Sequence, residues 1–505
     1  MIIGVFDDVV IGSGPTGWAA CEGIWSRGGS PTVIDIGYTN GNQANESVLR
    51  SPMVKPKLSF DADYMYSYPL SEMTITSDLS TIPLSGGRGG LSTVWGAGIQ
   101  PVSVCDLRGV PRDVSNQWMN SSNTLLRKMR YLGRADMLSE RDPWPVEPSE
   151  AVHLSSRFSR IHRRVSSSSL ALDDVVAFGS PRLAIGGRQP RYEGDVVCTL
   201  CGQCMTGCPQ GVIFDSGNQV VTGIHSRGGR YIQATVLKVV SAPHSTGGNH
   251  TIEVLAQLHD GTIVSVLARR LFLAAGAIGS VIILQKSKLI PDRTVIRDSQ
   301  MFYSSFFSLE RYVPDELHMT TSQGYFSTKS GVNERDEFSV SIYESSDDFL
   351  VRLRSLVPRS LQFAISTEGV LLKRVLPAIG FLSQDVSGRL VVENRSGEIR
   401  ISSEDNPETS TALINARRLL GRASRKIGLV QLPNPFSRPP IGSGFHVGAS
   451  LPMGDLTKSP TDWDGRLQGV PNLRVVDTSS LPRIKAGSHT FMAMANAYRI
   501  AANAD

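Results

Sequence analysis

The stretch Asp8-Val9-Val10-Ile11-Gly12-Ser13-Gly14-Pro15-Thr16-Gly17 carries the pattern on which the fold prediction depends. A β-branched apolar run ends at Ile11, three glycines follow in a six-residue frame, and residues 18–25 can continue as a helix. A second apolar run, residues 32–34, ends at Asp35. A strand, a glycine-rich turn, a helix and a second strand in this order are typical of dinucleotide-binding proteins. We therefore predict an α/β (α+β) fold with a Rossmann-type domain at its start.

Each glycine of this turn has a distinct expected role. Gly12 makes the turn, Gly14 lets the backbone approach a pyrophosphate, and Gly17 packs the helix on the strand. The start of the helix offers free N–H groups to phosphates, and Asp35 would accept hydrogen bonds from ribose hydroxyls. The same turn without a ligand is the alternative, and the turn does not distinguish FAD from NAD. The distant C-terminal segment is rich in Gly, His and Asp, which favours a chain that returns to one extended FAD.

The remainder of the chain indicates a second sheet. Residues 219–275 alternate apolar and polar side chains in short runs, and residues 300–400 contain more such runs. We therefore expect a largely antiparallel sheet in a separate substrate domain. Residues 412–427 and a segment from Thr490 are predicted to be helices, whereas the basic, Ser-rich residues 155–174 are interpreted as a solvated linker or helix edge.

Composition excludes several classes of protein. The 505 residues carry 51 Lys and Arg against 46 Asp and Glu, a net charge of +5, without the long basic block that nucleic-acid binding favours. The most apolar stretch, residues 271–284, is shorter than the ~18 residues that span a bilayer. The N-terminus lacks a basic region followed by a cleavage-type segment. We therefore expect a cytoplasmic protein with no transmembrane segment and no nucleic-acid partner.

Four separated segments resemble the glucose–methanol–choline (GMC) oxidoreductases, flavoenzymes that oxidise alcohols. The first is the glycine turn at 8–17, and the second is Gly86-Gly87-Arg88-Gly89-Gly90-Leu91-Ser92-Thr93-Val94-Trp95-Gly96. The third is Leu273-Ala274-Ala275-Gly276-Ala277-Ile278-Gly279-Ser280. The fourth is the tail that contains residues 445–450 and 469–479 and ends near His489-Thr490. Their order along the chain is that of the family.

This resemblance implies FAD as the cofactor and a discontinuous FAD-binding domain made of residues 1–110, 195–290 and 440–505. Residues 111–194 would form a linking or covering segment, and residues 291–439 a substrate domain. The resemblance places the ADP half of FAD on the glycine turn and Asp35, the flavin beside residues 90–95, and the ribityl and flavin ends near Asp477 and residues 489–491. The implied cofactor-binding residues are Gly12, Gly14, Pro15, Thr16, Gly17, Asp35, Gly90, Ser92, Thr93, Trp95, Val236, Ala275, Gly276, Asp477 and Thr490.

The resemblance also implies that His446 is the catalytic histidine and His489 the second polar catalytic residue. Alcohol oxidation removes a hydroxyl proton and a hydride, and a histidine with an ordinary pKa of ~6.5 suits the proton transfer. A second donor would stabilise the developing alkoxide. The alternative for each is a loop histidine that serves packing alone.

The cysteines form the most specific short motif, Cys198-x2-Cys201-x2-Cys204-x3-Cys208-Pro209, which has the spacing of a bacterial ferredoxin run. It predicts a 4Fe-4S cluster, with Cys208, Cys105 or Cys21 as the fourth ligand. A zinc site, a pair of disulfides and a metal-free relic are the alternatives.

We therefore predict FAD-dependent oxidation of a small-molecule alcohol, with a sugar or aminosugar hydroxyl as the suggested substrate. Electrons would leave through the cluster to an external acceptor protein or quinone, which would make the protein a dehydrogenase. The alternatives are a ketone reductase or redox isomerase, and a non-catalytic electron-transfer flavoprotein.

Overall fold

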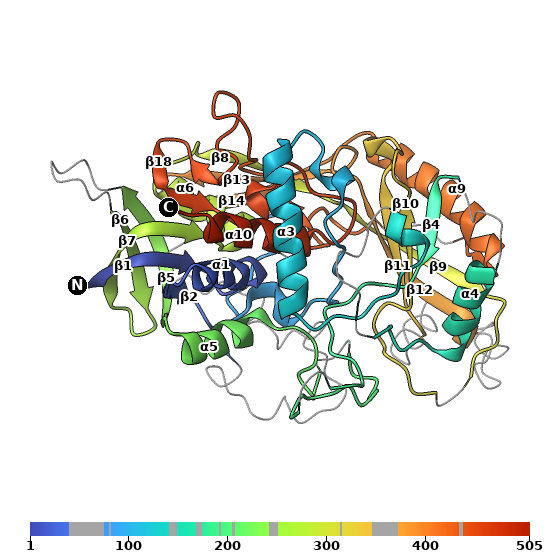
Figure 1. Cartoon of the computed structure of the whole chain (residues 1–505). Helices are drawn as coiled ribbons and strands as arrows, with labels where there is room; N and C mark the ends of the chain where they lie inside the picture. Colours follow the sequence, from blue (N-terminus) through green and yellow to red (C-terminus); the bar gives the residue numbers. More distant parts are fainter. Residues whose placement is uncertain are drawn as a thin grey trace.

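The computed structural model describes residues 1–39, 75–79, 82–140, 148, 150–167, 174–190, 193–204, 208–241, 251–313, 316–345, 372–433 and 438–505. Three β-sheets organise these residues (Figure 1). None of the helices among them combines the length and apolarity needed to cross a membrane.

A seven-stranded sheet carries the predicted dinucleotide turn. Its strands are β1 (Ile2–Ile11), β2 (Pro31–Asp35), β5 (Arg230–Ser241), β6 (Ile252–Leu258), β7 (Ile263–Leu273), β18 (Val470–Val475) and β17 (Arg466–Leu467). β1 pairs in parallel with β2 and β7, and β18 pairs in parallel with β7. Parallel strands buried on both faces are long apolar runs, as in the buried end of β1. The sheet therefore joins three distant parts of the chain.

Helices from several separate parts of the chain pack around this sheet (Figure 1). They are α1 (Pro15–Ser26), α3 (Arg112–Lys128), α5 (Ser216–Arg227), α6 (Gly276–Lys286) and α10 (Thr490–Ala502). α1 and α10 pack so closely that a Cβ on Gly23 would lie 2.7 Å from the Tyr498 carbonyl oxygen. The indole N–H of Trp118 in α3 donates to the Met492 carbonyl of α10 at 2.9 Å. The C-terminal helix is thus part of the core around the glycine turn.

A six-stranded antiparallel sheet forms the opposite end of the molecule (Figure 1). It contains β15 (Leu429–Gln431), β9 (Met301–Ser308), β12 (Val375–Leu382), β11 (Phe338–Ile342), β10 (Gly324–Thr328) and β4 (Val176–Gly179). α4 (Ser156–Ser167) and α9 (Thr409–Lys426) cover it, with Phe158 and Leu420 in the shared core. The mixed α/β fold and the predicted antiparallel sheet are therefore confirmed.

A five-stranded sheet connects the two larger ones. It contains β16 (Val447–Gly448), β8 (Arg293–Asp298), β13 (Arg389–Arg395), β14 (Glu398–Glu404) and β3 (Ile75–Ser77). Its apolar face packs on α6 through Ile278, Val281 and Ile282. The 3₁₀ turns are η3 (Gly90–Thr93), η4 (Val104–Leu107), η5 (Met137–Glu140), η6 (Glu334–Asp336), η7 (Leu372–Arg374) and η8 (Thr478–Ser480).

Two local expectations differ from the structure. The basic stretch at 155–174 contains the helix α4, which buries Phe158 and Ile161 and leaves Arg163 and Arg164 exposed. The segment expected to be rich in strands from residue 219 begins inside α5, which Asp215 caps by accepting from the Gly217 and Asn218 amides. Both helices are amphipathic, and the overall composition of a segment does not show the apolar face that buries one side of the helix.

Candidate functional site

The glycine turn leaves no room for side chains at two of its three glycines. Gly12 has a φ of +99°, and a Cβ there would lie 2.4 Å from the Ala274 carbonyl oxygen. A Cβ on Gly17 would lie 2.0 Å from the Gly12 carbonyl oxygen, so the helix packs directly on the turn. A Cβ on Gly14 would meet no atom within 4 Å. Gly14 is thus the position where the backbone faces open space.

The start of α1 has the features of a phosphate-binding helix end. Gly14 is its N-cap, no side chain caps it, and Pro15 occupies the first turn. Its first amides are therefore left for a ligand, and the positive end of the helix dipole favours an anion.

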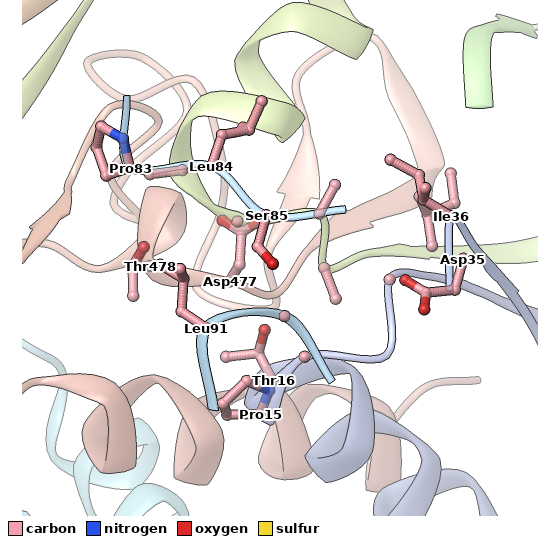
Figure 2. Close-up of a pocket in the computed structure, with 18 of the residues that line it drawn as sticks. Pro15, Thr16, Asp35, Ile36, Pro83, Leu84, Ser85, Leu91, Asp477 and Thr478 are labelled. Carbon is pink, nitrogen blue, oxygen red and sulfur yellow. The ribbon is translucent and has the colours of Figure 1, made fainter. Parts of the chain in front are cut away.

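A pocket of about 1130 Å³, counted out to open solvent, extends from this helix end. Figure 2 shows Pro15 and Thr16 on one side of it, Ser85 and Asp477 on the other, and Asp35 toward one end. The predicted site residues that line it are Gly12, Gly14, Pro15, Thr16, Asp35, Gly90, Val236, Ala275, Gly276, Asp477, His489 and Thr490. Four segments that are far apart in the sequence therefore meet around one space.

Asp35 lies at the end of β2, as the turn pattern predicts, but its carboxylate already has protein partners. Ser13 donates to it through its amide at 3.1 Å and its hydroxyl at 2.6 Å, and the Tyr231 hydroxyl donates at 2.6 Å. Burial raises the pKa of the Asp35 carboxyl, while these hydrogen bonds oppose the shift. Tyr231 lies on β5, which pairs with β2. The sequence did not identify Tyr231 as a hydrogen-bond partner of Asp35, because the contact depends on this strand pairing.

Asp477 joins the tail to α6. It accepts from the Ser280 hydroxyl at 2.5 Å and from the Ser479 amide at 2.8 Å. Burial raises its pKa, and a hydrogen bond from the Gly276 backbone is among the contacts that oppose the shift. The carboxyl thus holds the start of α6 against the tail at the pocket wall.

Ser92, Thr93 and Trp95, like Gly17, are not among the residues that line the pocket. Ser92 donates to the Gly89 carbonyl at 2.7 Å, Thr93 donates to the Gly90 carbonyl at 2.9 Å, and the Trp95 indole donates to the Phe214 carbonyl at 2.9 Å. These side chains fix the shape of the segment, and Gly90 and Leu91 supply its wall.

The two predicted catalytic histidines lie together. Their ring centroids are 5.2 Å apart in an edge-to-face arrangement, and His446 stacks on Phe381 with centroids 4.0 Å apart. His489 lines the pocket, whereas His446 lies between Phe445 and Val447, which line it. Phe445 and Ala449 have positive φ values of +56° and +48°, so the backbone around His446 is held in a conformation that side-chain-bearing residues rarely adopt.

Both imidazoles are held neutral. Burial, followed by the proximity of His489, lowers the pKa of His446 well below its usual value. Burial lowers the pKa of His489 to about 4. His489 Nδ1 faces the Gly487 carbonyl at 3.3 Å, whereas the buried Nδ1 of His446 has no hydrogen-bond partner among the described residues. A neutral imidazole with an unpartnered nitrogen can accept a proton.

Phe381 was missed by sequence reasoning. It stands near the end of β12, more than sixty residues before His446, in a segment without a recognisable motif. No local pattern could have identified it as the residue that supports the histidine ring.

The cysteine motif does not form a metal site among the described residues, which include all four of its cysteines. Cys198 and Cys204 are buried, Cys201 is exposed and Cys208 is intermediate. Burial raises the pKa of Cys198, and the three other thiols are near enough to raise it further. The predicted 4Fe-4S cluster therefore has no support in this arrangement.

Cys21 and Cys105, the other candidates for a fourth ligand, lie elsewhere. Cys21 is fully buried in α1, where burial raises its pKa strongly, and Cys105 lies in η4 beside Asp106. Cys21 serves as a small core residue, since it lies in the core that α1 shares with α10.

Two segments of the chain that contribute to the pocket match known family models. Residues 185–298 match the N-terminal family model "GMC oxidoreductase", and residues 399–497 match the C-terminal one. Over these two segments the chain is similar to the GMC oxidoreductases. The first match contains Val236 and Gly276, and the second contains Asp477 and His489, so both contribute to the pocket.

Solved structures show a related fold for the whole GMC-like chain. Pyridoxine 4-oxidase from Mesorbium loti aligns with a TM-score of 0.59 over 98% of each chain, at 14% sequence identity. At this identity the likeness concerns the fold alone. No curated protein has a significant match to the sequence. The GMC oxidoreductases bind FAD, and the open space at Gly14 and the uncapped start of α1 fit its pyrophosphate.

Proposed function

We propose that this protein oxidises the hydroxyl of a small-molecule alcohol with FAD as its cofactor. The observation that carries the proposal is the pair of neutral imidazoles, His446 and His489, in one pocket region with a dinucleotide-type turn. Phosphate-binding and proton-accepting groups are thereby combined on one cavity, as a flavin-dependent alcohol oxidation requires.

The residues of the chain have separate tasks in this proposal. The amides at the start of α1 bind the pyrophosphate, and residues of β2 and β5 enclose the other end of the cofactor. When bound, FAD supplies the acceptor for the hydride that leaves the carbinol carbon. His489 contacts the substrate oxygen from the pocket wall, and His446, whose ring lies edge to face with that of His489, accepts the hydroxyl proton.

The substrate class that we propose is a polyol-like alcohol, with sugars and aminosugars as the first candidates. The support for this substrate class is analogy with the activity of the family. The described pocket walls add little to it, because their only ionisable side chains are those of Asp35, Asp477 and His489. The electron acceptor is an external molecule. The proposed reaction assigns no step to the cysteine segment.

Anaerobic reduction of the purified flavoprotein tests the proposal. Glucose, N-acetylglucosamine, pyridoxine and benzyl alcohol are mixed with the enzyme, and loss of the 450-nm flavin band is recorded. We expect bleaching by at least one alcohol, its loss in His446→Ala, and its retention in His225→Ala, which changes an exposed histidine of α5. Dithionite should reduce all three proteins.

Two results would redirect the assignment. Reoxidation of the reduced flavin by a ketone, without reduction by any alcohol, would identify a reductase. Unchanged reduction in His446→Ala would remove the histidine from the reaction, and a colourless protein that does not bind added FAD would overturn the proposal.

A further inference from the structure

The buried connection between β8 and β9, residues Asp298, Ser299 and Gln300, lies behind the histidine pair. All three residues have at most 1% of their surface exposed, although each carries a polar side chain. Buried polar groups are normally retained where they form specific hydrogen bonds. We call these residues the junction, because they join the five-stranded and six-stranded sheets.

The junction holds the loop that carries His446 at both of its ends. Asp298 Oδ2 accepts from the Gly442 amide at 2.8 Å, where the loop begins. The Ser299 amide donates to the His446 carbonyl at 3.0 Å, and Val447 then pairs with Asp298 as β16 joins β8. Asp298 and Ser299 therefore hold the loop from Gly442 to Val447 by hydrogen bonds at both of its ends.

The same junction holds the strand that carries Phe381. The Ser299 hydroxyl donates to the Leu382 carbonyl at 2.8 Å, and the Leu382 amide donates to the Gln300 carbonyl at 3.1 Å. Leu382 follows Phe381 in β12. One short segment thus fixes both members of the stack between His446 and Phe381.

The loop also lies directly on Phe381. A Cβ on Gly444 would be 3.0 Å from the Phe381 ring and 3.1 Å from Met301 Cβ. A side chain at this position would therefore press on the Phe381 ring. The stack, the loop and the junction leave little freedom for the His446 imidazole.

We propose that Asp298 and Ser299 are positioning residues for His446: their hydrogen bonds to Gly442 and Leu382 fix the imidazole against Phe381 and beside His489. The contacts described above support the positioning of His446. Its importance for the rate of flavin reduction rests on the proposed function. A displacement of about 1 Å in a reacting group can lower a rate by about 10²-fold, so such supports are worth measuring.

Histidine NMR tests the positioning without any substrate. The FAD-loaded protein is labelled at histidine with ¹³C and ¹⁵N, and the His446 ring is assigned from its missing resonance in His446→Asn. A ring stacked on Phe381 should show an upfield-shifted ring proton. Ser299→Ala and Asp298→Ala should move that resonance toward the position of an exposed histidine, and Asp298→Asn, which keeps an acceptor for Gly442, should restore it.

The matched control is Ser308→Ala, because Ser308 is as buried as Ser299 but lies at the end of β9 that is far from the junction. Its His446 resonance should not move. In flavin reduction by an alcohol, we expect Ser299→Ala and Asp298→Ala to lower the limiting rate about tenfold or more, with a smaller change in the apparent dissociation constant.

The outcomes separate the two claims. A shifted resonance in a protein that no alcohol reduces would keep the positioning and remove the proposed function. An unchanged His446 resonance in Ser299→Ala, which removes one hydroxyl, would overturn the positioning even if Asp298→Ala fails to fold. Equal shifts in Ser308→Ala would show general loosening of the sheet and would overturn it too.

Discussion

His446 and His489 meet edge to face with their ring centroids 5.2 Å apart, and the proximity of His489 adds to the burial that lowers the pKa of His446. Because the pKa of His489 is lowered to about 4, its neutral form persists well below the range where an ordinary histidine titrates. The rate of flavin reduction should therefore stay nearly constant from pH 8 down to about pH 5.

The paired arrangement makes a second prediction for His489→Asn. Removing the neighbouring imidazole removes an interaction that lowers the pKa of His446, so the pH at which the rate falls should rise. The measurement is the limiting rate of anaerobic reduction from pH 4.5 to 8 for both proteins. A loss of rate near pH 6.5 in the unmodified protein would show that its essential histidine is not held neutral by burial.

Stability should depend on pH through two buried groups that act in opposite directions. Burial raises the pKa of Asp298 to about 7, so its contribution is fully present below pH ~4 and is lost as pH rises to about 7. The lowered pKa of His489 has the reverse effect, because stability is lost as pH falls from about 6.5 to 4. These shifts correspond to about 4 and 3 kcal/mol, so they largely offset each other.

Comparison of Asp298→Asn with the unmodified protein should isolate the contribution of Asp298. We expect the free energy of unfolding of this variant, relative to the unmodified protein, to increase steadily between pH 4 and 7 and then level off. Urea unfolding at five pH values measures it. A difference that does not change with pH would mean that Asp298 titrates alike in the folded and unfolded chains.

Two neighbouring glycines should separate folding from cofactor binding. Gly14→Ala adds a methyl group that meets no protein atom within 4 Å but enters the space proposed for the pyrophosphate. We expect apoprotein stability within about 1 kcal/mol of the original and weaker FAD binding, measured by flavin fluorescence. Gly12→Ala, with a methyl group 2.4 Å from the Ala274 carbonyl, should destabilise the apoprotein itself by more. Equal FAD affinity in Gly14→Ala would contradict the placement.

The cysteine segment predicts a ranking of thiol reactivity. Cys201 is exposed, whereas Cys198, Cys204 and Cys21 are buried with raised pKa values for Cys198 and Cys21. Because the exposed thiolate is the reactive form, a short iodoacetamide treatment of the native protein followed by peptide mass spectrometry should modify Cys201 first. Protection of Cys201, together with four irons per chain, would show that the cluster predicted from the spacing assembles after all.

The sequence was sufficient for the elements whose local pattern has a single physical meaning. The glycine turn, the strand ending at Asp35 and the helix that begins at Thr490 all lie where they were predicted. A turn that needs positive φ and a close backbone approach tolerates few residues, so its pattern is informative. The proximity of His446 and His489 followed from the family resemblance, and no local pattern contains it.

The supports of the site could not be predicted in this way. Phe381 and Asp298 reach the histidines through strand pairing and loop closure between segments that are up to 150 residues apart. The five-stranded sheet is built from four separate parts of the chain, and β3 pairs with β14 across more than 300 residues. Pairing at such distances depends on the assembled core, which leaves no periodic pattern in either strand alone.

The route of the chain through the seven-stranded sheet has a consequence for biosynthesis. β1 emerges from the ribosome before its partners: its neighbour β7 gains β18 only after residue 475, and α1 gains α10 later still. The domain around the glycine turn therefore stays incomplete during synthesis until α10 has been made. Capture of the proposed cofactor must wait for this helix, and a ribosome that stalls before α10 would leave an exposed apolar surface for chaperones to shield.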